Sequence, residues 1–502
     1  MKLLLINPGK GNNKKGDFWD FEFEKRILGQ HSLIPLALPT IAGATPKDID
    51  IEIIDENVEK INYDEKVDLV AIGAMTPRIT RGYEIADEFR KRKVPVVIGG
   101  IHASMMPEEA SLHADSVVIG EADCLWPEVI NDFRNSGMKK SYRFTEYPKL
   151  GDIASPRYDL VKSEKYVINQ VQTTRGCPFD CDFCSVKAFS GQEFRLKNID
   201  QIIRELEALP DTYDIDILGY KFKSPKTLLF ADDNIIGNKK YARNLFERII
   251  PMKLTDWYCQ GSINIGKDKE MLAMMKQAGC HSMIVGIESV VQESLKGMDK
   301  KVNRVADYYE SIANIQSMGI KVLGSFVLGS DEEDDSVFEK TVKFIRENNL
   351  VFCMVNVLTP LPGTRLYKRL DSENRILHKN WEKYDFETVC FEPKQMSAKT
   401  LEEGRKFVCK EIYSLNNIDE RYRNFMKQKS FTEVRGFEES LSKMGITEKA
   451  FSALLIMKIL YKLNGEQRRY LIKMLKQHFK GEETNFGNTM AVMSFNDYAM
   501  SI

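Results

Sequence analysis

Short apolar runs that alternate with helical patterns constrain the fold of this chain more than any other sequence feature. Runs of this length and composition are typical of parallel strands that are buried on both faces. Between them lie amphipathic segments such as Ile79–Arg92, which predict helices. The pattern therefore predicts an α/β fold with a doubly wound parallel sheet in the N-terminal third. Its predicted strands are Leu3–Ile6, Ile51–Ile54, Leu69–Ile72, Val94–Ile98 and Ser116–Ile119.

The alternation resumes at longer spacing in the middle third of the chain. Six strand–helix units there predict a partial (βα)6 barrel, in which functional groups gather at the carboxyl ends of the strands. The predicted strands are 167–173, 227–231, 256–263, 282–287, 320–328 and 352–358, and the predicted helices are 199–209, 238–249, 268–278, 305–318 and 336–348.

Composition divides the chain into four segments. We expect a sheet domain over residues 1–138, a polar and turn-rich linker over 139–165, the barrel over 166–370 and a helical C-terminal segment over 371–502. In the last segment, Ser397–Tyr413 begins with a helix-capping pattern and Phe451–Phe479 has apolar residues at helical spacing. The Lys and Arg residues of the second helix favour a solvated face, with peripheral membrane contact as the alternative.

The composition also excludes classes of function. Among 502 residues there are 72 Lys and Arg and 73 Asp and Glu, so no basic excess indicates nucleic-acid binding. Nine cysteines in so long a chain do not make a disulfide framework, which favours reduced thiols. No apolar stretch reaches the length of about 18 residues that a membrane span needs, and the first apolar run is too short for a signal peptide. We therefore expect a soluble, cytoplasmic protein.

Three cysteines on one short loop carry the strongest chemical signal. Cys177, Cys181 and Cys184 follow the first predicted barrel strand with the spacing C-x3-C-x2-C. A structural zinc site takes four ligands, usually from two separated pairs, and this loop does not offer them. A four-iron cluster takes one thiolate per iron, so three cysteines hold it and leave one iron open. The loop predicts a 4Fe–4S cluster and resembles the cluster loop of the radical S-adenosylmethionine (SAM) superfamily, where SAM binds the open iron.

Polar residues stand at the ends of other predicted barrel strands, where the resemblance implies SAM binding. Asp232, Asp233 and Asn234 follow the second strand. A carboxylate there would bind the ammonium group of SAM, and helix capping is the alternative. Glu288, after the fourth strand, would accept hydrogen bonds from the ribose, and backbone groups near Ser325, on the fifth, would pair with adenine.

The turns after the N-terminal strands form a second candidate rim, because ligands bind at the carboxyl ends of strands in open α/β sheets. Tight turns need glycines without any ligand, which is the alternative explanation. The sheet and the stretch Gly99-Gly100-Ile101-His102-Ala103-Ser104 resemble the flavodoxin-like cobalamin-binding domain of class B radical SAM enzymes. The resemblance implies cobalamin-binding residues at Asn7, Gly73, Met75, Thr76, Gly99, Gly100, His102, Gly120 and Glu121.

The sequence departs from other cobalamin proteins at one point. The Asp-x-His-x-x-Gly pattern that supplies a histidine to cobalt is absent, because His102 is followed by Ala103 and Ser104. We therefore favour a turn histidine that is hydrogen-bonded to its own loop over a cobalt ligand.

Further motifs extend the resemblance over about the first 425 residues. They are Phe18–Phe21, Ile34–Leu38, Phe230–Lys239, Val285–Glu288, Leu361–Tyr367 and Phe391–Ser397. They are similar to a branch that includes hopanoid C-2 methylases and bacteriochlorophyll side-chain methylases. A second cluster, as in tRNA methylthiotransferases, would need three N-terminal cysteines, and Cys124 alone precedes Cys177.

The resemblance implies a cobalamin-dependent radical SAM enzyme that methylates an unactivated carbon of an apolar lipid or tetrapyrrole through a 5′-deoxyadenosyl radical. Formation of a ring or a carbon–carbon bond without methyl transfer is the first alternative, and a non-catalytic sensing protein is the second. The implied cofactors are a 4Fe–4S cluster, SAM and cobalamin. The implied partners are a small apolar substrate and a flavodoxin- or ferredoxin-type electron donor.

Overall fold

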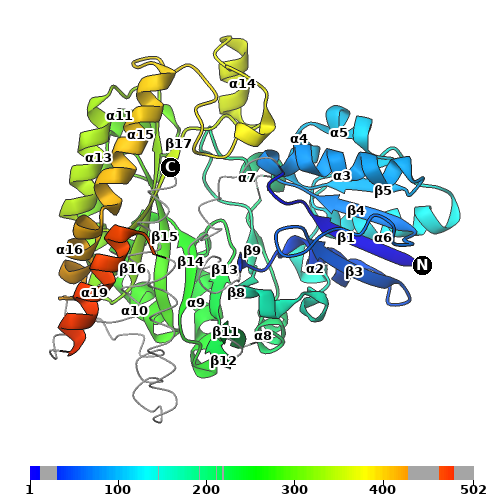
Figure 1. Cartoon of the computed structure of the whole chain (residues 1–502), viewed down its shortest axis with the longest axis horizontal. Coiled ribbons are helices and arrows are strands. Elements are labelled where there is room, and N and C mark those ends of the chain that lie inside the picture. Colours follow the sequence, from blue (N-terminus) through cyan, green and yellow to red (C-terminus); the bar gives the residue numbers. More distant parts are fainter. Residues whose placement is uncertain are drawn as a thin grey trace.

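The computed structural model describes residues 1–11, 31–144, 146–191, 193–210, 212–217, 220–427 and 463–479. The motif Phe18–Phe21, residues 451–462 of the last predicted helix and the tail from Glu482 lie outside these ranges. An N-terminal sheet domain lies beside a larger barrel, and the helices that follow the barrel pack on the side of it that is remote from the sheet domain (Figure 1).

The N-terminal sheet is parallel, and its described part has six strands in the order β3-β1-β4-β5-β6-β7. The first five strands therefore follow the flavodoxin-like order 2-1-3-4-5, as predicted. The sixth strand, β7, lies in the predicted linker and adds an edge to the sheet. The strands are β1 (Lys2–Asn7), β3 (Asp50–Asp55), β4 (Leu69–Gly73), β5 (Val96–Gly99), β6 (Ser116–Ile119) and β7 (Ser141–Arg143).

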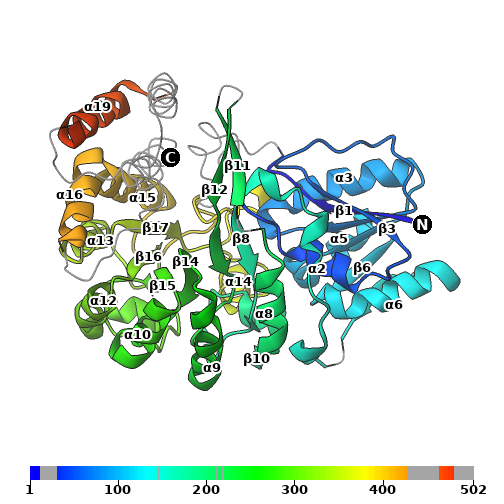
Figure 2. The same cartoon turned by 90° about the horizontal axis from the view of Figure 1, so that it is seen from below.

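Helices cover both faces of this sheet (Figure 2). Successive side chains of a strand point to opposite faces, so Leu4 and Ile6 of β1 belong to one apolar core while Leu3 and Leu5 belong to the other. The first core includes α3 (Ile79–Lys91) and α5 (Pro107–His113), and the second includes α2 (Ala37–Ala44) and α6 (Ala122–Asn135). The short helix α4 (Ile101–Met105) follows β5.

The second sheet is also parallel and forms the predicted partial barrel. Its order is β17-β16-β15-β14-β13-β8-β2. The last of these, β2 (His31–Leu33), comes from the N-terminal segment and pairs with β8, so the barrel sheet takes a strand from outside the predicted barrel. The other strands are β8 (Tyr166–Val171), β13 (Thr227–Phe230), β14 (Trp257–Gly261), β15 (Cys280–Glu288), β16 (Lys321–Leu328) and β17 (Phe352–Val357).

The crossover helices of the barrel lie within the predicted ranges. They are α8 (Ile199–Glu207), α9 (Lys239–Ile249), α10 (Lys269–Gln277), α12 (Tyr308–Ser317) and α13 (Ser336–Glu347). Two antiparallel pairs were not predicted, namely the hairpin β11 (Thr212–Ile217) with β12 (Tyr220–Pro225), and β9 (Thr174–Arg175) with β10 (Arg195–Leu196). The helices α7 (Val186–Ser190), α11 (Gln292–Gly297) and α14 (Arg365–Ser372) complete the rim.

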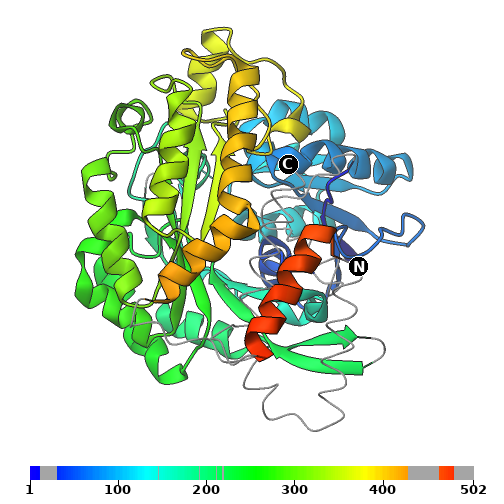
Figure 3. The same cartoon turned by 60° about the vertical axis from the view of Figure 1, so that its left-hand side comes forward.

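The C-terminal helices pack on the last barrel units (Figure 3). The helix α15 (Ala398–Tyr413) begins as predicted, because the Ser397 side chain accepts a hydrogen bond from the Thr400 backbone N–H. The buried Arg421 on α16 (Leu415–Met426) donates to the carbonyls of Leu350 and Ile412. The last described helix is α19 (Gly465–Phe479). Within the described ranges, no helix combines the length and the apolar character that crossing a membrane requires.

The turn before β15 gives a test of the fold. This turn is remote from the strand ends where the candidate site lies. Gly279 has φ +98°, and a Cβ there would lie 1.9 Å from the Leu254 carbonyl oxygen. Gly137 has φ +85°, and a Cβ there would meet no heavy atom of a described residue within 4 Å. We expect Gly137→Ala to cost about 1 kcal/mol of strain and Gly279→Ala about 3 kcal/mol or more. Thermal unfolding followed by circular dichroism tests this, and equal midpoints for the two variants would contradict it.

Candidate functional site

The cysteine loop follows β9 at the carboxyl end of the barrel and is held by its backbone. The Asp182 N–H donates to the Met298 carbonyl at 3.1 Å, and the Leu366 N–H donates to the Asp182 carbonyl at 3.0 Å. Arg365 donates to the Asp180 carbonyl at 2.6 Å. Leu366 and Arg365 belong to the motif Leu361–Tyr367, so this motif anchors the loop to the start of α14.

The three thiols are free and lie in a partly buried setting. Burial raises the pKa of Cys177, raises that of Cys181 to about 11 and raises that of Cys184 to about 12. Lys300 lies close enough to favour their thiolates, and its Nζ contacts Glu288 Oε1 at 2.6 Å. Burial alone would lower the pKa of Lys300, but Glu288 and the thiols raise it, so a cation stands beside the loop.

This donor set fits a multi-iron cluster. In the described part of the chain, no three His, Cys, Asp or Glu side chains converge as they would around a single metal ion. A four-iron cube takes each thiolate on a different iron, so its ligands need not converge on one point. Three thiols and the half-buried Lys300 cation suit an anionic cluster.

Asp232 holds the end of β8 in place. Its Oδ1 accepts hydrogen bonds from the backbone N–H and the hydroxyl of both Thr173 and Thr174. Burial raises the pKa of Asp232 to about 6, although these donors lower it. Its Oδ2 is buried and has no hydrogen-bond donor among the described residues. Asp232 therefore orders the chain immediately before the cysteine loop.

Asp233 and Asn234 have more acceptor capacity to spare. Among the described residues, Asp233 accepts one hydrogen bond, from the Gly176 N–H at 3.1 Å, and burial raises its pKa to about 6. Asn234 donates to Ser262, and its buried Oδ1 has no donor in the described ranges. Neither residue caps α9, because Asn238 does so through the Tyr241 N–H. These acceptors fit a cationic ligand such as the ammonium group of SAM.

Glu288 lies at the end of β15 in a left-handed conformation, with φ +63°. The side chain of Asn303 supports this turn by donating to the carbonyls of Gly286 and Ile287. Ser325 lies on β16 opposite Gly286 and is half-buried. The structure thus brings Glu288 and Ser325 to adjacent strands of the rim.

Sequence reasoning missed Glu333, which joins two strand ends. Its buried carboxylate accepts from the Ser289 hydroxyl at 2.6 Å and from the backbone N–H of Gly329 and Ser330 at 2.8 and 3.2 Å. It therefore connects the turn after Glu288 to the turn after β16. The available signal in the sequence was that Glu333 lies four positions after Gly329. An acidic residue in such a place is also common where a helix is about to begin, so the signal was not specific.

A cavity of about 470 Å³ lies between the two domains. Of the nine predicted cobalamin-binding residues, it is lined by Gly73, Gly99, Gly100, Gly120 and Glu121. Its opposite wall comes from the segment after Cys184, including Ser185, Val186 and Phe189, and Asp233 also lines it. The turns of the N-terminal sheet and the cysteine loop therefore face one space.

The glycines of this rim have different reasons to be there. Gly100 has φ +96°, and a Cβ there would lie 2.7 Å from the Ala74 carbonyl oxygen, so the turns after β4 and β5 approach too closely for another residue. A Cβ at Gly73 would meet no heavy atom of a described residue within 4 Å. Gly73 leaves room on the cavity side, which fits a bulky group such as cobalamin.

The remaining predicted residues of this rim do not line the cavity. Asn7 donates to Asp55, Thr76 is buried, and the Met75 side chain is 56% exposed. His102 is fully buried, and its Nε2 lies 3.3 Å from Glu109 Oε1. Its ring also contacts Trp381, and the Trp381 Nε1 donates to Glu109.

Apolar residues of α2, of α6 and of the position just before α2 complete the cavity, and sequence reasoning did not assign them to a site. They include Leu36, Leu38 and Trp126. The motif Ile34–Leu38 was the available signal for the first two. Trp126 looks like an ordinary core residue, and its Nε1 donates to the Thr45 hydroxyl.

Comparisons with known proteins agree with this arrangement. The radical SAM superfamily model matches residues 171–345, the B12 binding domain model matches residues 31–130, and a domain of unknown function matches residues 364–501. The bacteriochlorophyllide d C-8(2)-methyltransferase of Chlorobaculum tepidum is 32% identical over 71% of this chain and 80% of its own length.

The chain belongs to the cobalamin-dependent branch of the radical SAM superfamily. It is an enzyme of the C-methyltransferase type, and its cofactors are a 4Fe–4S cluster, SAM and cobalamin. The hopanoid C-2 methylase of Rhodopseudomonas palustris is 29% identical over 68% of this chain and 65% of its own length.

Solved structures show the same fold. TsrM, a radical SAM methyltransferase from Kitasatospora setae with cobalamin and a 4Fe–4S cluster bound, superposes with a TM-score of 0.57 at 15% identity, covering 74% of this chain and 75% of its own. OxsB, a cobalamin-dependent SAM radical enzyme, superposes with a TM-score of 0.60 at 13% identity. The match covers 100% of this chain and 79% of the OxsB chain.

The two neighbouring carboxylates after β13 give a test of the site. Asp232→Ala would leave the donors of Thr173 and Thr174 without their acceptor, at a cost of about 3 kcal/mol or more. Asp233→Ala removes one hydrogen bond and should cost about 1 kcal/mol. Thermal unfolding of the full chain, with trypsin cleavage after Arg175 as a local probe, measures the difference. Equal losses for the two variants would contradict these roles.

Proposed function

We propose that this enzyme transfers the methyl group of SAM to an unactivated carbon of an apolar small molecule, a tetrapyrrole or a lipid. The observation that carries the proposal is one cavity that faces both the cysteine loop and the turns of the N-terminal sheet. Relatives named as methyltransferases of bacteriochlorophyllide and as a hopanoid methylase support both substrate classes.

We assign the cluster to Cys177, Cys181 and Cys184. Because burial keeps these thiols protonated near neutral pH, cluster assembly must release their protons. Lys300 then balances the added negative charge with little screening by solvent, since its side chain is 15% exposed. The bonds to Met298, Leu366 and Arg365 keep the loop in position against the barrel.

We assign SAM to the adjoining strand ends. Asp233 and Asn234 would accept hydrogen bonds from the SAM ammonium group, and Glu288 from the ribose, while backbone groups near Ser325 would pair with adenine. Asp232 is a positioning residue in this scheme, because its Oδ1 is committed to Thr173 and Thr174. Burial of these groups excludes water, which strengthens each electrostatic contact.

We assign cobalamin to the glycine turns and to the apolar space between the sheet and helices α2 and α6. Once bound, the cluster and SAM supply a radical, and cobalamin supplies a carrier for the methyl group. The chain contributes orientation: Gly73 and Gly99 leave room at the strand ends, and Phe189 and Val186 bring the segment after the cluster loop to the opposite wall.

We also propose a flavodoxin- or ferredoxin-type protein as the electron donor. The reduced cluster is oxygen-labile and the nine cysteines are free thiols, which suits a reducing, cytoplasmic compartment.

Ring formation without methyl transfer is the second candidate. The anaerobic magnesium-protoporphyrin IX monomethyl ester cyclase of Rubrivivax gelatinosus is 23% identical over 86% of this chain, which is a wider match than the methyltransferases show. We favour methylation because this cyclase is less similar to the chain, at 23% identity, than the bacteriochlorophyllide methyltransferases are, at 32% and 30%.

Labelled SAM separates the two candidates. The anaerobically reconstituted enzyme is incubated with methyl-labelled SAM, a reductant and candidate tetrapyrroles or hopanoids. We expect label in the product at one methyl group per product molecule. A product without label would remove methyl transfer and leave the cyclase type of reaction.

Replacement of one loop cysteine tests the cluster assignment. Cys181→Ala should lower iron content and abolish the release of 5′-deoxyadenosine, because the cube loses one of three ligands. Cys409→Ala is the matched control, since Cys409 is a buried thiol on α15. Retention of SAM cleavage by Cys181→Ala would refute the ligand assignment.

A further inference from the structure

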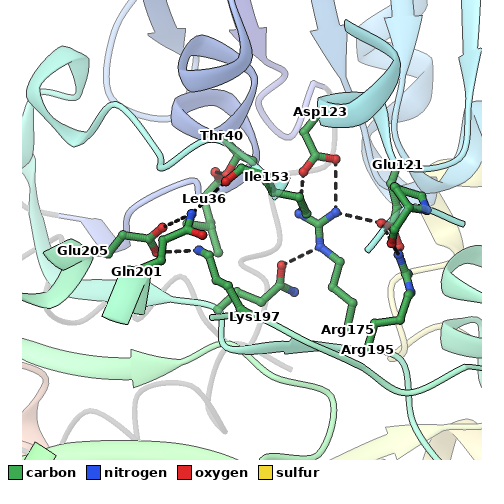
Figure 4. Close-up of polar contacts among 12 residues, drawn as sticks. Leu36, Thr40, Glu121, Asp123, Ile153, Arg175, Arg195, Lys197, Gln201 and Glu205 are labelled. Atoms are coloured by element: carbon green, nitrogen blue, oxygen red, sulfur yellow. Dashed lines mark hydrogen bonds and ion pairs between the residues drawn. The ribbon is translucent and has the colours of Figure 1, made fainter. Parts of the chain in front are cut away.

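Glu121 has a role in this structure that cobalamin binding does not explain. It follows β6 in the turn that leads into α6, and its side chain is 2% exposed. Although it occupies the N-cap position of α6, its carboxylate makes no capping hydrogen bond. Both carboxylate oxygens accept hydrogen bonds from arginines of the other domain instead (Figure 4).

The first of these arginines leads directly into the cysteine loop. Arg175 is two residues before Cys177, and its guanidinium donates to Glu121 Oε2 at 2.8 Å. It also donates to the two carboxylate oxygens of Asp123, at 3.1 and 2.9 Å. Arg175 thus binds the β6–α6 turn of the sheet domain in a forked geometry.

The second arginine comes from a different part of the barrel domain. Arg195 on β10 pairs with Arg175 on β9, so the two side chains lie on the same face of this short ribbon. Arg195 donates to both oxygens of Glu121, to the Pro148 carbonyl and to the Ser190 carbonyl at the end of α7. Its guanidinium also lies 4.9 Å from the centre of the Tyr147 ring.

The cluster of charges is buried and balanced. Glu121 and Asp123 face Arg175 and Arg195, and all four side chains are at most 14% exposed. Removing one member of such a cluster leaves a buried charge without compensation. Glu121, Asp123 and Arg175 line the cavity between the domains, and so does Ser190.

We propose that Glu121, held by Arg175 and Arg195, is a positioning residue that sets the spacing between the glycine turns of the sheet domain and the cysteine loop. This inference rests on the proposed function, because it assigns cobalamin to one wall of the cavity and the cluster with SAM to the other. The cysteine loop has separate anchors within the barrel at Met298, Leu366 and Asp232, so loss of Glu121 should move the walls apart and leave each wall intact.

Three variants of the full-length holoenzyme test the role. Glu121→Gln removes the charge but keeps the shape of the side chain. Glu121→Gln with Arg195→Gln removes one acid and one base, which restores charge balance without the ion pair between Glu121 and Arg195. Asp159→Asn is the matched control, because its ion pair with Arg157 lies on the surface, with the two side chains 61% and 42% exposed.

The decisive measurement needs no substrate. With SAM and titanium(III) citrate as reductant, S-adenosylhomocysteine reports transfer of the SAM methyl group to the reduced cobalamin of the holoenzyme. 5′-Deoxyadenosine reports reductive SAM cleavage at the cluster, with the electron supplied by titanium(III). We expect Glu121→Gln to lower the ratio of S-adenosylhomocysteine to 5′-deoxyadenosine by about tenfold or more, since small misplacements of reacting groups have effects of this size. The double variant should regain thermal stability, but its ratio of S-adenosylhomocysteine to 5′-deoxyadenosine should stay low. The control should match the wild type in both stability and ratio.

Two results would overturn the proposal. One is a wild-type ratio in a folded Glu121→Gln enzyme with full iron content. The other is a ratio that returns with stability in the double variant, because Glu121 would then serve charge balance alone.

Hydrogen exchange of the protein without cofactors gives a second readout. Faster exchange of peptides 116–123 and 174–190 in Glu121→Gln supports the interdomain contact, and unchanged exchange contradicts it. If wild type forms 5′-deoxyadenosine but no S-adenosylhomocysteine, methyl transfer fails as the proposed function, while the exchange experiment still decides whether Glu121 joins the two walls.

Discussion

The carboxyl ends of parallel strands lie at the same edge of a sheet, and this constraint places the candidate site of the enzyme. Two parallel sheets turn these ends toward one cavity, so groups that are far apart in the sequence come together there. The cysteine loop follows β8 and β9, Asp233 follows β13 and Gly120 follows β6.

Polar side chains hold the turns, because a buried backbone N–H or carbonyl needs a partner. Asp232 satisfies the end of β8, Glu333 joins the turns after β15 and β16, and Glu121 joins the two domains. Each of these carboxylates accepts several hydrogen bonds, which commits it to the fold even though Asp232 Oδ2 has no donor among the described residues. Asp233 and Asn234 retain acceptor capacity for a ligand, and they are the ones that we assign to SAM.

Prediction from the sequence succeeded where the information is local. The period of the apolar runs located every strand of the flavodoxin-like core and of the six-stranded barrel unit, and the spacing of Cys177, Cys181 and Cys184 identified the cluster loop. The sequence pattern did not predict that β2, from the N-terminal segment, pairs with β8 of the barrel, or that β7 extends the first sheet. Edge pairing of short strands depends on which neighbour is available in space, and three residues carry no periodic signal.

The sequence by itself therefore determined the two α/β units, the three thiols and the set of polar residues at the strand ends. Only the tertiary structure divided that set into residues that hold the fold and residues that face the cavity. Asp232 and Asp233 are chemically identical neighbours, and Glu121 and Glu288 both lie at strand ends, yet their partners differ. A side chain's role depends on which donors lie within about 3 Å of it. In these four contacts the donor lies 12 to 74 positions away in the chain.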